Sequence, residues 1–247
     1  MADPINVVRF LDTMGKNLTH DAPPQDRKVM RPFITISREP GAGGHSLAEA
    51  LLAEFRRRPE TDELQGWGVF DQKLCETVAQ DPKLRVSMQS LIREEYRGEL
   101  ADYISQAVAG TSAQSTVLAK VFETVRSLAW LGKVVIVGRA AACATRGFSH
   151  GIHVRLIAGR EHRVRRMMGS LRADRREAER IMREQEDFRA ALVRDYFQRD
   201  IADPHLYDCV WNVEKVPLER VSRVLADMVT ELADDHRLAK QEAEPVS

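Results

Sequence analysis

A glycine-rich turn between a short strand and a helical pattern is the feature that most constrains this chain. Residues 34–46 read Ile-Thr-Ile-Ser-Arg-Glu-Pro-Gly-Ala-Gly-Gly-His-Ser, and the helical pattern Leu47–Phe55 follows. Gly41, Gly43 and Gly44 admit backbone conformations and close approaches that side chains block. Successive N–H groups and a helix N-terminus can therefore converge on an anion. This layout is typical of a phosphate-binding loop.

The loop lacks one standard part. The pattern G-x-x-x-x-G-K-[ST] would place its first glycine at Arg38 and its lysine at Gly44, with His45 and Ser46 following. A protonated His45 could replace part of the missing charge, but imidazole is mostly neutral at pH 7. The sequence predicts a phosphate cradle without its usual ammonium group.

Composition narrows the classes of function. The 247 residues are enough for one sizeable α/β domain with additions. Lysine and arginine together number 37, and so do aspartate and glutamate, so no net charge attracts nucleic acid or an anionic membrane. Any anion binding must come from local basic clusters. The basic stretch 160–200 is interleaved with acids throughout, which disfavours nucleic acid as its partner.

Cysteine usage and hydropathy indicate the compartment. Cys75, Cys143 and Cys209 are few, widely spaced and odd in number, which argues against a disulfide framework and against structural zinc. The N-terminus lacks the continuous apolar segment of a signal peptide, and no run approaches the roughly 20 apolar residues that span a bilayer. We expect a cytoplasmic protein without a membrane partner.

An N-terminal helical arm and linker, residues 1–31, precede the main domain. Val7, Phe10, Leu11 and Met14 share one face of a predicted helix. This apolar stripe either packs on its own domain or pairs with a second copy in a homodimer. Self-packing is favoured because a lone amphipathic helix usually covers its own core.

Strands and helices alternate through the main domain, residues 32–235. Buried strands are expected at Phe33–Ser37, Trp67–Phe70, Lys133–Val137, Ile152–Ile157 and Tyr207–Asn212. Alternation of this kind predicts an α/β fold with a parallel sheet, right-handed crossovers and flanking helices. The remaining predicted parts are a helical insert at about 81–131, a charged helical lid at about 170–203 and a polar tail at 236–247.

Three further motifs follow the glycine loop along the chain. They are Val134-Val-Ile-Val-Gly-Arg139, Val154-Arg-Leu-Ile-Ala-Gly-Arg-Glu-His-Arg-Val-Arg-Arg166 and Arg199-Asp200-Ile-Ala-Asp203. In this order the motifs resemble the cytidylate kinase-like branch of the P-loop nucleoside monophosphate kinases, over about residues 32–232. The resemblance implies a P-loop NTPase-type sheet, an acceptor-binding insert, an arginine-containing lid, and the cofactors ATP and Mg²⁺.

The resemblance also implies where the donor nucleotide binds. The expected cofactor-binding residues are Arg38, Gly41, Ala42, Gly43, Gly44, His45, Ser46 and Arg163. In the cytidylate kinase-like form of the loop, Ser46 falls at the hydroxyl position. It either contacts Mg²⁺, directly or through water, or caps the helix without a metal.

Arginines are the expected catalytic residues, because phosphoryl transfer needs positive charge over the transferring oxygens. Arg139 follows a predicted strand, where α/β sheets place ligand-binding residues; otherwise it is a salt-bridged arginine at a helix start. Arg183 and Arg189 are the lid candidates, although the alternating charges over 183–194 also suit a solvated helix face.

Carboxylates complete the predicted acceptor site. Asp71, Asp200 and Asp203, together with Arg139, are the expected acceptor-binding residues, and each aspartate could instead cap a helix or turn. Two functions fit the sequence. One is Mg²⁺-dependent transfer of phosphoryl from ATP to a nucleoside monophosphate or a similar small phosphorylated acceptor. The alternative is a nucleotide-binding regulatory or interaction module that keeps the cradle without efficient turnover.

Overall fold

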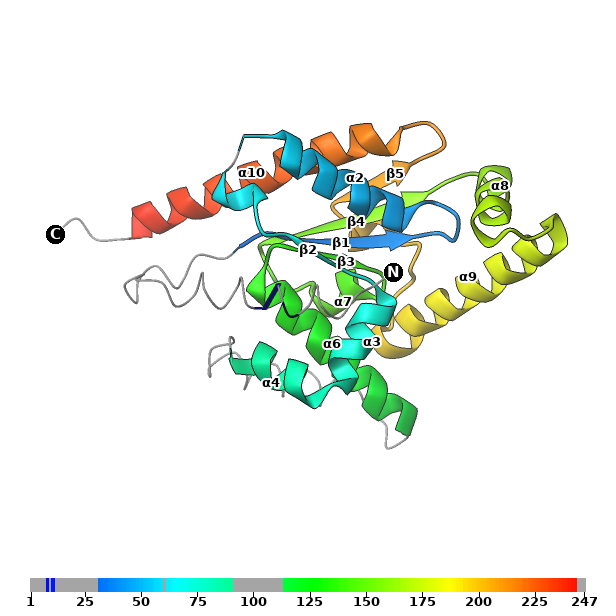
Figure 1. Ribbon diagram of the computed structural model, residues 1–247, viewed down its shortest axis with the longest axis horizontal. Coiled ribbons are helices and arrows are strands. Elements are labelled where there is room, and N and C mark those ends of the chain that lie inside the picture. Colours follow the sequence, from blue (N-terminus) through cyan, green and yellow to red (C-terminus); the bar gives the residue numbers. More distant parts are fainter. Residues whose placement is uncertain (1–7, 9, 12–30, 60, 91–112, 244–247) are drawn as a thin grey trace.

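The computed structural model describes residue 8 and the ranges 10–11, 31–59, 61–90 and 113–243 (Figure 1). Its centre is a five-stranded parallel sheet in the order β2-β3-β1-β4-β5. The strands are β1 Phe33–Arg38, β2 Gly68–Phe70, β3 Val134–Val137, β4 Gly151–Ile157 and β5 Cys209–Asn212. The expected α/β class is confirmed, and strand bounds differ from the expected ones by no more than two residues.

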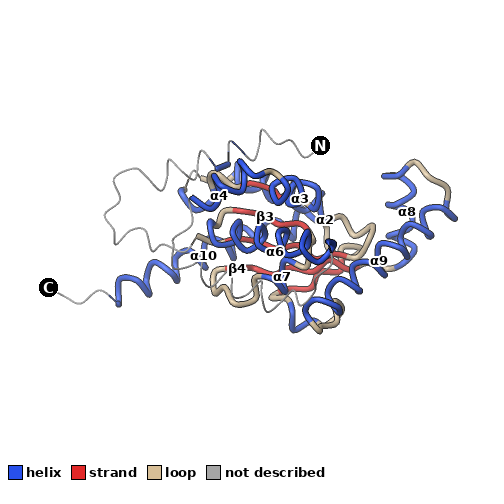
Figure 2. Tube along the Cα trace, turned by 90° about the horizontal axis from the view of Figure 1, so that it is seen from below, coloured by secondary structure: helices blue, strands red, loops and turns tan. Residues whose placement is uncertain are grey.

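Helices cover both faces of the sheet (Figures 1 and 2). They are α2 Gly44–Arg57, α3 Gln72–Gln80, α4 Pro82–Ser90, α6 Ala113–Leu131, α7 Ala141–Ala144, α8 Arg160–Leu171, α9 Arg175–Phe197 and α10 Leu218–Ala243, with short 3₁₀ turns at Asp62–Leu64 and Pro204–Leu206. In the described part of the chain, no helix is long and apolar enough to cross a membrane.

The two faces carry separate hydrophobic cores, because successive strand residues point to opposite sides of a sheet. On β3, Val134 and Ile136 pack with α3 and α6, whereas Val135 and Val137 pack with α2 and α10. All four valine and isoleucine side chains of this strand are fully buried. The continuous apolar strand therefore reflects burial on both faces.

Two residues of the N-terminal arm join the first of these cores. Phe10 and Leu11 are each 6% exposed, and the Phe10 ring meets the Phe70 ring edge-on at a centroid distance of 5.3 Å. These contacts agree with self-packing of the arm. Val7 and Met14 lie outside the described residues, as does most of the predicted arm.

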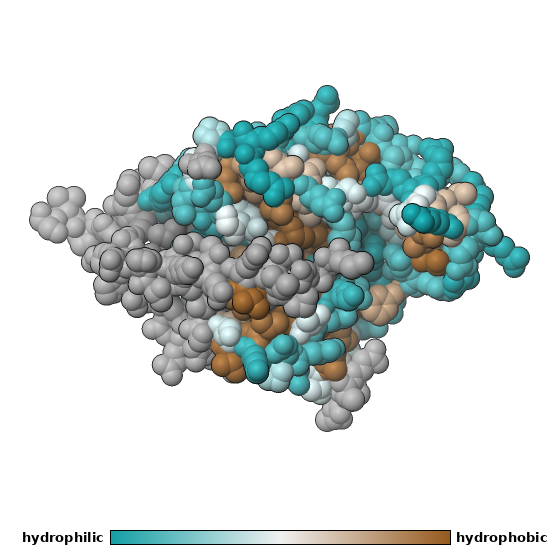
Figure 3. Space-filling model, viewed as in Figure 1, coloured by the Kyte–Doolittle hydropathy of each residue, from teal (hydrophilic) through white to brown (hydrophobic). Residues whose placement is uncertain are grey.

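Helices α8 and α9 project together from one end of the molecule, and the C-terminal end of α10 lies at the other (Figures 1 and 2). The projecting end is mostly hydrophilic on the face shown in Figure 3. α9 buries only a few apolar residues, including Ala178, Met182, Leu192 and Val193. This is the segment predicted as a lid; the middle of the predicted insert, 91–112, lies outside the described residues.

Candidate active site

The glycine loop turns the chain from β1 into α2. Gly41 and Gly43 have φ angles of +82° and +87°, a region that residues with side chains rarely adopt. A Cβ atom on Gly41 would lie 2.6 Å from the backbone oxygen of Arg163. No side chain caps α2, which begins at Gly44. The first N–H groups of the helix therefore face the loop, as an anion cradle requires.

An arginine from α8 lies over this cradle. The Nη2 atom of Arg166 is 3.3 Å from the Ser46 hydroxyl oxygen and donates a hydrogen bond to it. The same Nη2 atom would be 2.8 Å from a Cβ atom on Gly43. Because Arg166 is exposed, its guanidinium can reorient toward a bound phosphate. It places a cation beside the loop that lacks lysine.

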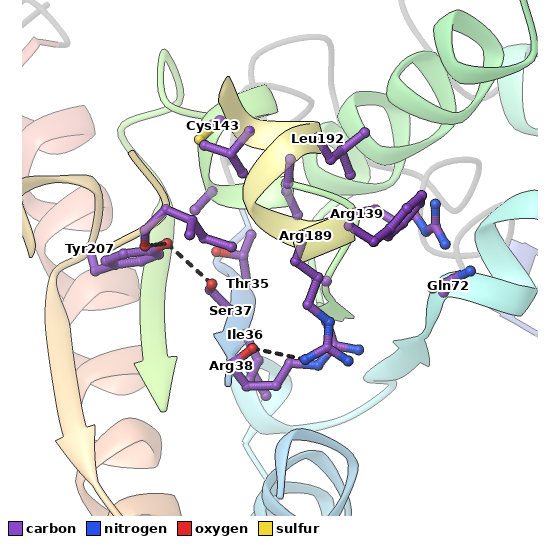
Figure 4. A pocket seen from close by; sticks show the side chains of 17 residues that line it. Thr35, Ile36, Ser37, Arg38, Gln72, Arg139, Cys143, Arg189, Leu192 and Tyr207 are labelled. Atoms are coloured by element: carbon purple, nitrogen blue, oxygen red, sulfur yellow. Dashed lines mark hydrogen bonds between the residues drawn. The ribbon is translucent and has the colours of Figure 1, made fainter. Parts of the chain in front are cut away.

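A pocket opens next to the loop at the carboxyl ends of β1 and β3, the edge where parallel sheets bind ligands (Figure 4). Arg38 from β1, Arg139 after β3 and Arg189 from α9 all line it. Nη1 of Arg189 donates a 3.0 Å hydrogen bond to the backbone oxygen of Arg38. Three guanidinium groups from separate elements therefore meet in one cavity.

These arginines perturb one another. Burial, followed by the charges of Arg189 and Arg139, lowers the pKa of Arg38 to about 9. Burial and the nearby Arg155 lower the pKa of Arg189 to about 10, and burial lowers that of Arg139. Like charges held together in a partly buried site favour an anion that neutralises them. The pocket is electrostatically suited to a phosphate group.

The turn after β3 is strained where it presents Arg139. Gly138, Arg139 and Ala140 have φ angles of +87°, +57° and +49° in succession, and the latter two carry side chains. Conformations of this kind cost about 1–3 kcal/mol each and concentrate at functional sites. The Arg139 side chain is 4% exposed and its Nη2 lies 3.0 Å from Oε1 of Glu76. That nitrogen is buried and makes no hydrogen bond among the described residues, so a donor of Arg139 is left unsatisfied.

The predicted aspartates act mainly as caps. Oδ1 of Asp71 accepts a 2.9 Å hydrogen bond from the backbone N–H of Leu74 at the start of α3. Asp200 and Asp203 accept hydrogen bonds from the N–H groups two residues further on. Asp71 also has an oxygen 3.5 Å from Nε2 of His45, so the start of α3 lies beside the glycine loop.

Comparison with known proteins identifies a family whose model matches the part of the chain that contains this site. The model of the cytidylate kinase-like family matches residues 33–215, which include the loop, the arginine pocket and α9. The chain belongs to this family. Membership supports a nucleotide-binding, kinase-like role and is consistent with the resemblance of the motifs.

A solved structure supports the fold. The crystal structure of an uncharacterized protein from Eubacterium ventriosum ATCC 27560 is similar to this one with a TM-score of 0.62 and 19% sequence identity, covering 81% of this chain and 99% of that chain. At this level of identity the likeness shows the fold alone. A comparison with curated proteins gives no match.

Two of the predicted site arginines, Arg163 and Arg183, do not line the arginine pocket. Arg163 is buried, and its guanidinium contacts Glu186 and lies 3.3 Å from a carboxylate oxygen of Glu39. It thus joins α8 to α9 and to the glycine loop. Arg183 is exposed on α9 and does not line the pocket. Unlike Arg139 and Arg189, neither residue is in position to contact a ligand bound in the pocket.

Phe188 and Tyr207, which line the pocket, and Arg155, which contacts the pocket residue Ser37, were not predicted. Arg155 is 7% exposed on β4, and its Nη1 donates to the Ser37 hydroxyl oxygen at 3.0 Å. Tyr207 donates to the same oxygen at 3.1 Å, and Phe188 lines the pocket while 52% exposed. An arginine within a predicted buried strand was a usable signal for Arg155. Nothing in the sequence distinguished Phe188 from an ordinary core residue of α9.

Proposed function

We propose that this protein transfers the γ-phosphoryl group of ATP to a nucleoside monophosphate or a similar small phosphorylated acceptor. The observation that carries the proposal is the junction of two anion sites. The glycine loop leads into α2, and the arginine pocket adjoins it through Arg38, which lines the pocket and packs against Gly44. A donor and an acceptor phosphate bound at these sites would be neighbours, as in-line transfer requires.

In this proposal, the glycine loop binds the donor nucleotide and the pocket arginines bind the acceptor. The backbone of 41–44 would hold the donor phosphates, with Arg166 above them. Arg139, after β3, and Arg189, on α9, both line the pocket and would bind the acceptor phosphate there. An acceptor phosphate oxygen then forms the bond to the γ-phosphorus while the bridging oxygen leaves with ADP. Charge on these oxygens is stabilised by guanidinium groups that are already in place.

The loop fits a nucleotide that carries Mg²⁺. The described residues include no group of three His, Cys, Asp or Glu side chains able to hold a metal, so a dedicated protein cage is not what these residues provide. Mg²⁺ in nucleotide sites is bound mainly by substrate phosphates, waters and one or two protein oxygens. Ser46, in the first turn of α2, would supply such an oxygen. The metal would neutralise charge on the phosphates when bound.

The test is turnover with purified protein, ATP, Mg²⁺ and a panel of ribo- and deoxyribonucleoside monophosphates. We expect one or more acceptors to be converted to the diphosphate with equal formation of ADP, measured by chromatography. Arg139→Ala should lower kcat at least about a hundredfold, since removal of one transition-state donor commonly costs that much.

A negative result also discriminates. ATP binding by calorimetry without turnover on any acceptor would contradict the kinase and favour the nucleotide-binding module, which the glycine at position 44 also fits. Gly43→Val in the folded protein should abolish ATP binding under either function. Unchanged affinity in that variant would exclude the loop as the nucleotide site.

A further inference from the structure

Two of the departures from the standard phosphate loop are in contact with each other. Arg38 replaces the first glycine of the pattern and Gly44 replaces its lysine. A Cβ atom built on Gly44 would lie 3.1 Å from both Cγ and Cδ of Arg38 and 3.3 Å from its Nε. Its three nearest neighbours are therefore all atoms of the Arg38 side chain. Arg38 occupies the space that a side chain at position 44 would enter.

The rest of the Arg38 side chain continues toward the acceptor pocket. Its Nη1 would be only 2.2 Å from a Cβ atom on Gly138, so the guanidinium lies against the bare backbone at the end of β3. Arg139 and Arg189 are close enough to lower its pKa. The guanidinium thus lies between the glycine cradle and the acceptor pocket, where the transferring group would pass.

No carboxylate in the described part of the chain pairs directly with this charge. Among the described residues, none of the ion pairs within 4.0 Å involves Arg38, and Asp71 influences it only from further away. By contrast, Arg139 is paired with Glu76, and Arg163 with two glutamates. A partly buried cation without a counter-ion is stabilised by a bound anion.

We propose that Arg38 and Gly44 are an exchanged pair, in which Arg38 supplies to the transferring phosphoryl group the cation that a standard loop supplies from position 44. This assignment rests on the proposed phosphotransferase function. The exchange also changes the chemistry of the contact. Lysine offers a point charge, whereas the planar guanidinium presents several donors and can bind oxygens of donor and acceptor at once.

A four-protein cycle tests the pairing: wild type, Arg38→Gly, Gly44→Lys and the double variant. Arg38→Gly should lower kcat at least about a hundredfold through loss of the cation. Gly44→Lys should lower it similarly, because the new side chain displaces the Arg38 stem. In the double variant the lysine enters space that Arg38 has vacated, and kcat should return to within about tenfold of wild type. Arg38→Ala/Gly44→Lys is a second version should Gly at 38 weaken β1.

Controls separate pairing from general damage. Arg189→Ala/Gly44→Lys removes another pocket cation, which is not among the nearest neighbours of Gly44, and should show no recovery. Thermal unfolding of each variant establishes that the compared proteins are folded. Losses that simply multiply in the double variant would overturn the exchanged pair, since independent sites behave additively.

The exchanged pair can be tested even if the proposed phosphotransferase activity is absent. If wild type transfers phosphoryl to no acceptor, the same four proteins are compared for ATP affinity by calorimetry. Loss in both single variants with recovery in the double variant would still support the pairing. Additive effects on affinity would reject it, whatever the outcome for turnover.

Discussion

Gly138→Ala is the most direct way to move Arg38 without altering it. The added methyl group would lie 2.2 Å from Nη1 of Arg38, far inside the contact distance of a carbon and a nitrogen, so the guanidinium must shift. The alanine would also be held at a φ of +87°. We therefore expect one substitution to affect both the fold and the arginine pocket.

The size of each effect follows from the geometry. A side chain at this φ costs about 1–3 kcal/mol of unfolding free energy. For a chain of this length, each kcal/mol lowers Tm by about 2–4 °C. The displaced guanidinium should reduce kcat about a hundredfold, close to the loss expected for Arg38→Gly.

Gly147→Ala is the matched control. No heavy atom lies within 4 Å of a Cβ atom at that position, and its φ is not positive. Its Tm and kcat should stay near those of wild type. Differential scanning calorimetry and steady-state kinetics measure both quantities on the three proteins. Full activity in Gly138→Ala, in folded protein, would refute the argument that the placement of Arg38 matters for transfer.

Three other outcomes are expected. Arg166→Ala should raise the KM for ATP several-fold more than Arg165→Ala, an exposed arginine of the same helix, in initial-rate assays. Phe188→Ala should weaken binding of a nucleoside monophosphate by about 1–3 kcal/mol, because stacking on the base is lost. Binding of ribose 5-phosphate, which has no base, should not change. Leu171→Ala, at an exposed position outside the pocket, should affect the binding of neither ligand. Burial lowers the pKa of His150 to about 4, below the roughly 6.5 of an unfolded histidine, so the unfolded chain binds more protons between these values. Stability should therefore fall by up to about 3 kcal/mol as pH drops from about 6.5 to 4 in urea titrations, and His150→Leu should flatten that slope.

Much of the fold could be predicted because it follows from periodicity. The apolar runs around Ile34 and Ile136 can only be buried strands, and the glycines after β1 require a turn into a helix. The site was harder because arginine has a long, flexible side chain whose direction the sequence does not encode. Arg163 and Arg166 are one helical turn apart, yet one pairs with glutamates and the other lies over the loop.

Capping was also hard to separate from ligand binding. Asp71 lies at the same sheet edge as the pocket, but its first hydrogen bond closes the start of α3. A short carboxylate at a helix N-terminus suits both roles, so residue type alone does not choose. Arg183 is exposed because of how α9 is rotated about its own axis relative to the pocket. This rotation is set by the packing of buried residues such as Leu192, and the sequence pattern determines that packing only loosely.

The strand order has a consequence for how the chain is made. β1 occupies the middle of the sheet, but its neighbours come much later: the paired residues Thr35 and His153 are 118 positions apart. At a synthesis rate of about 5–20 residues per second, β1 is complete roughly 6–24 s before β4 exists. β3 ends only 14 residues before β4 begins, so for most of this interval both edges of β1 lack their partner strands. The greatest risk of aggregation therefore falls during translation, before the parallel sheet can close.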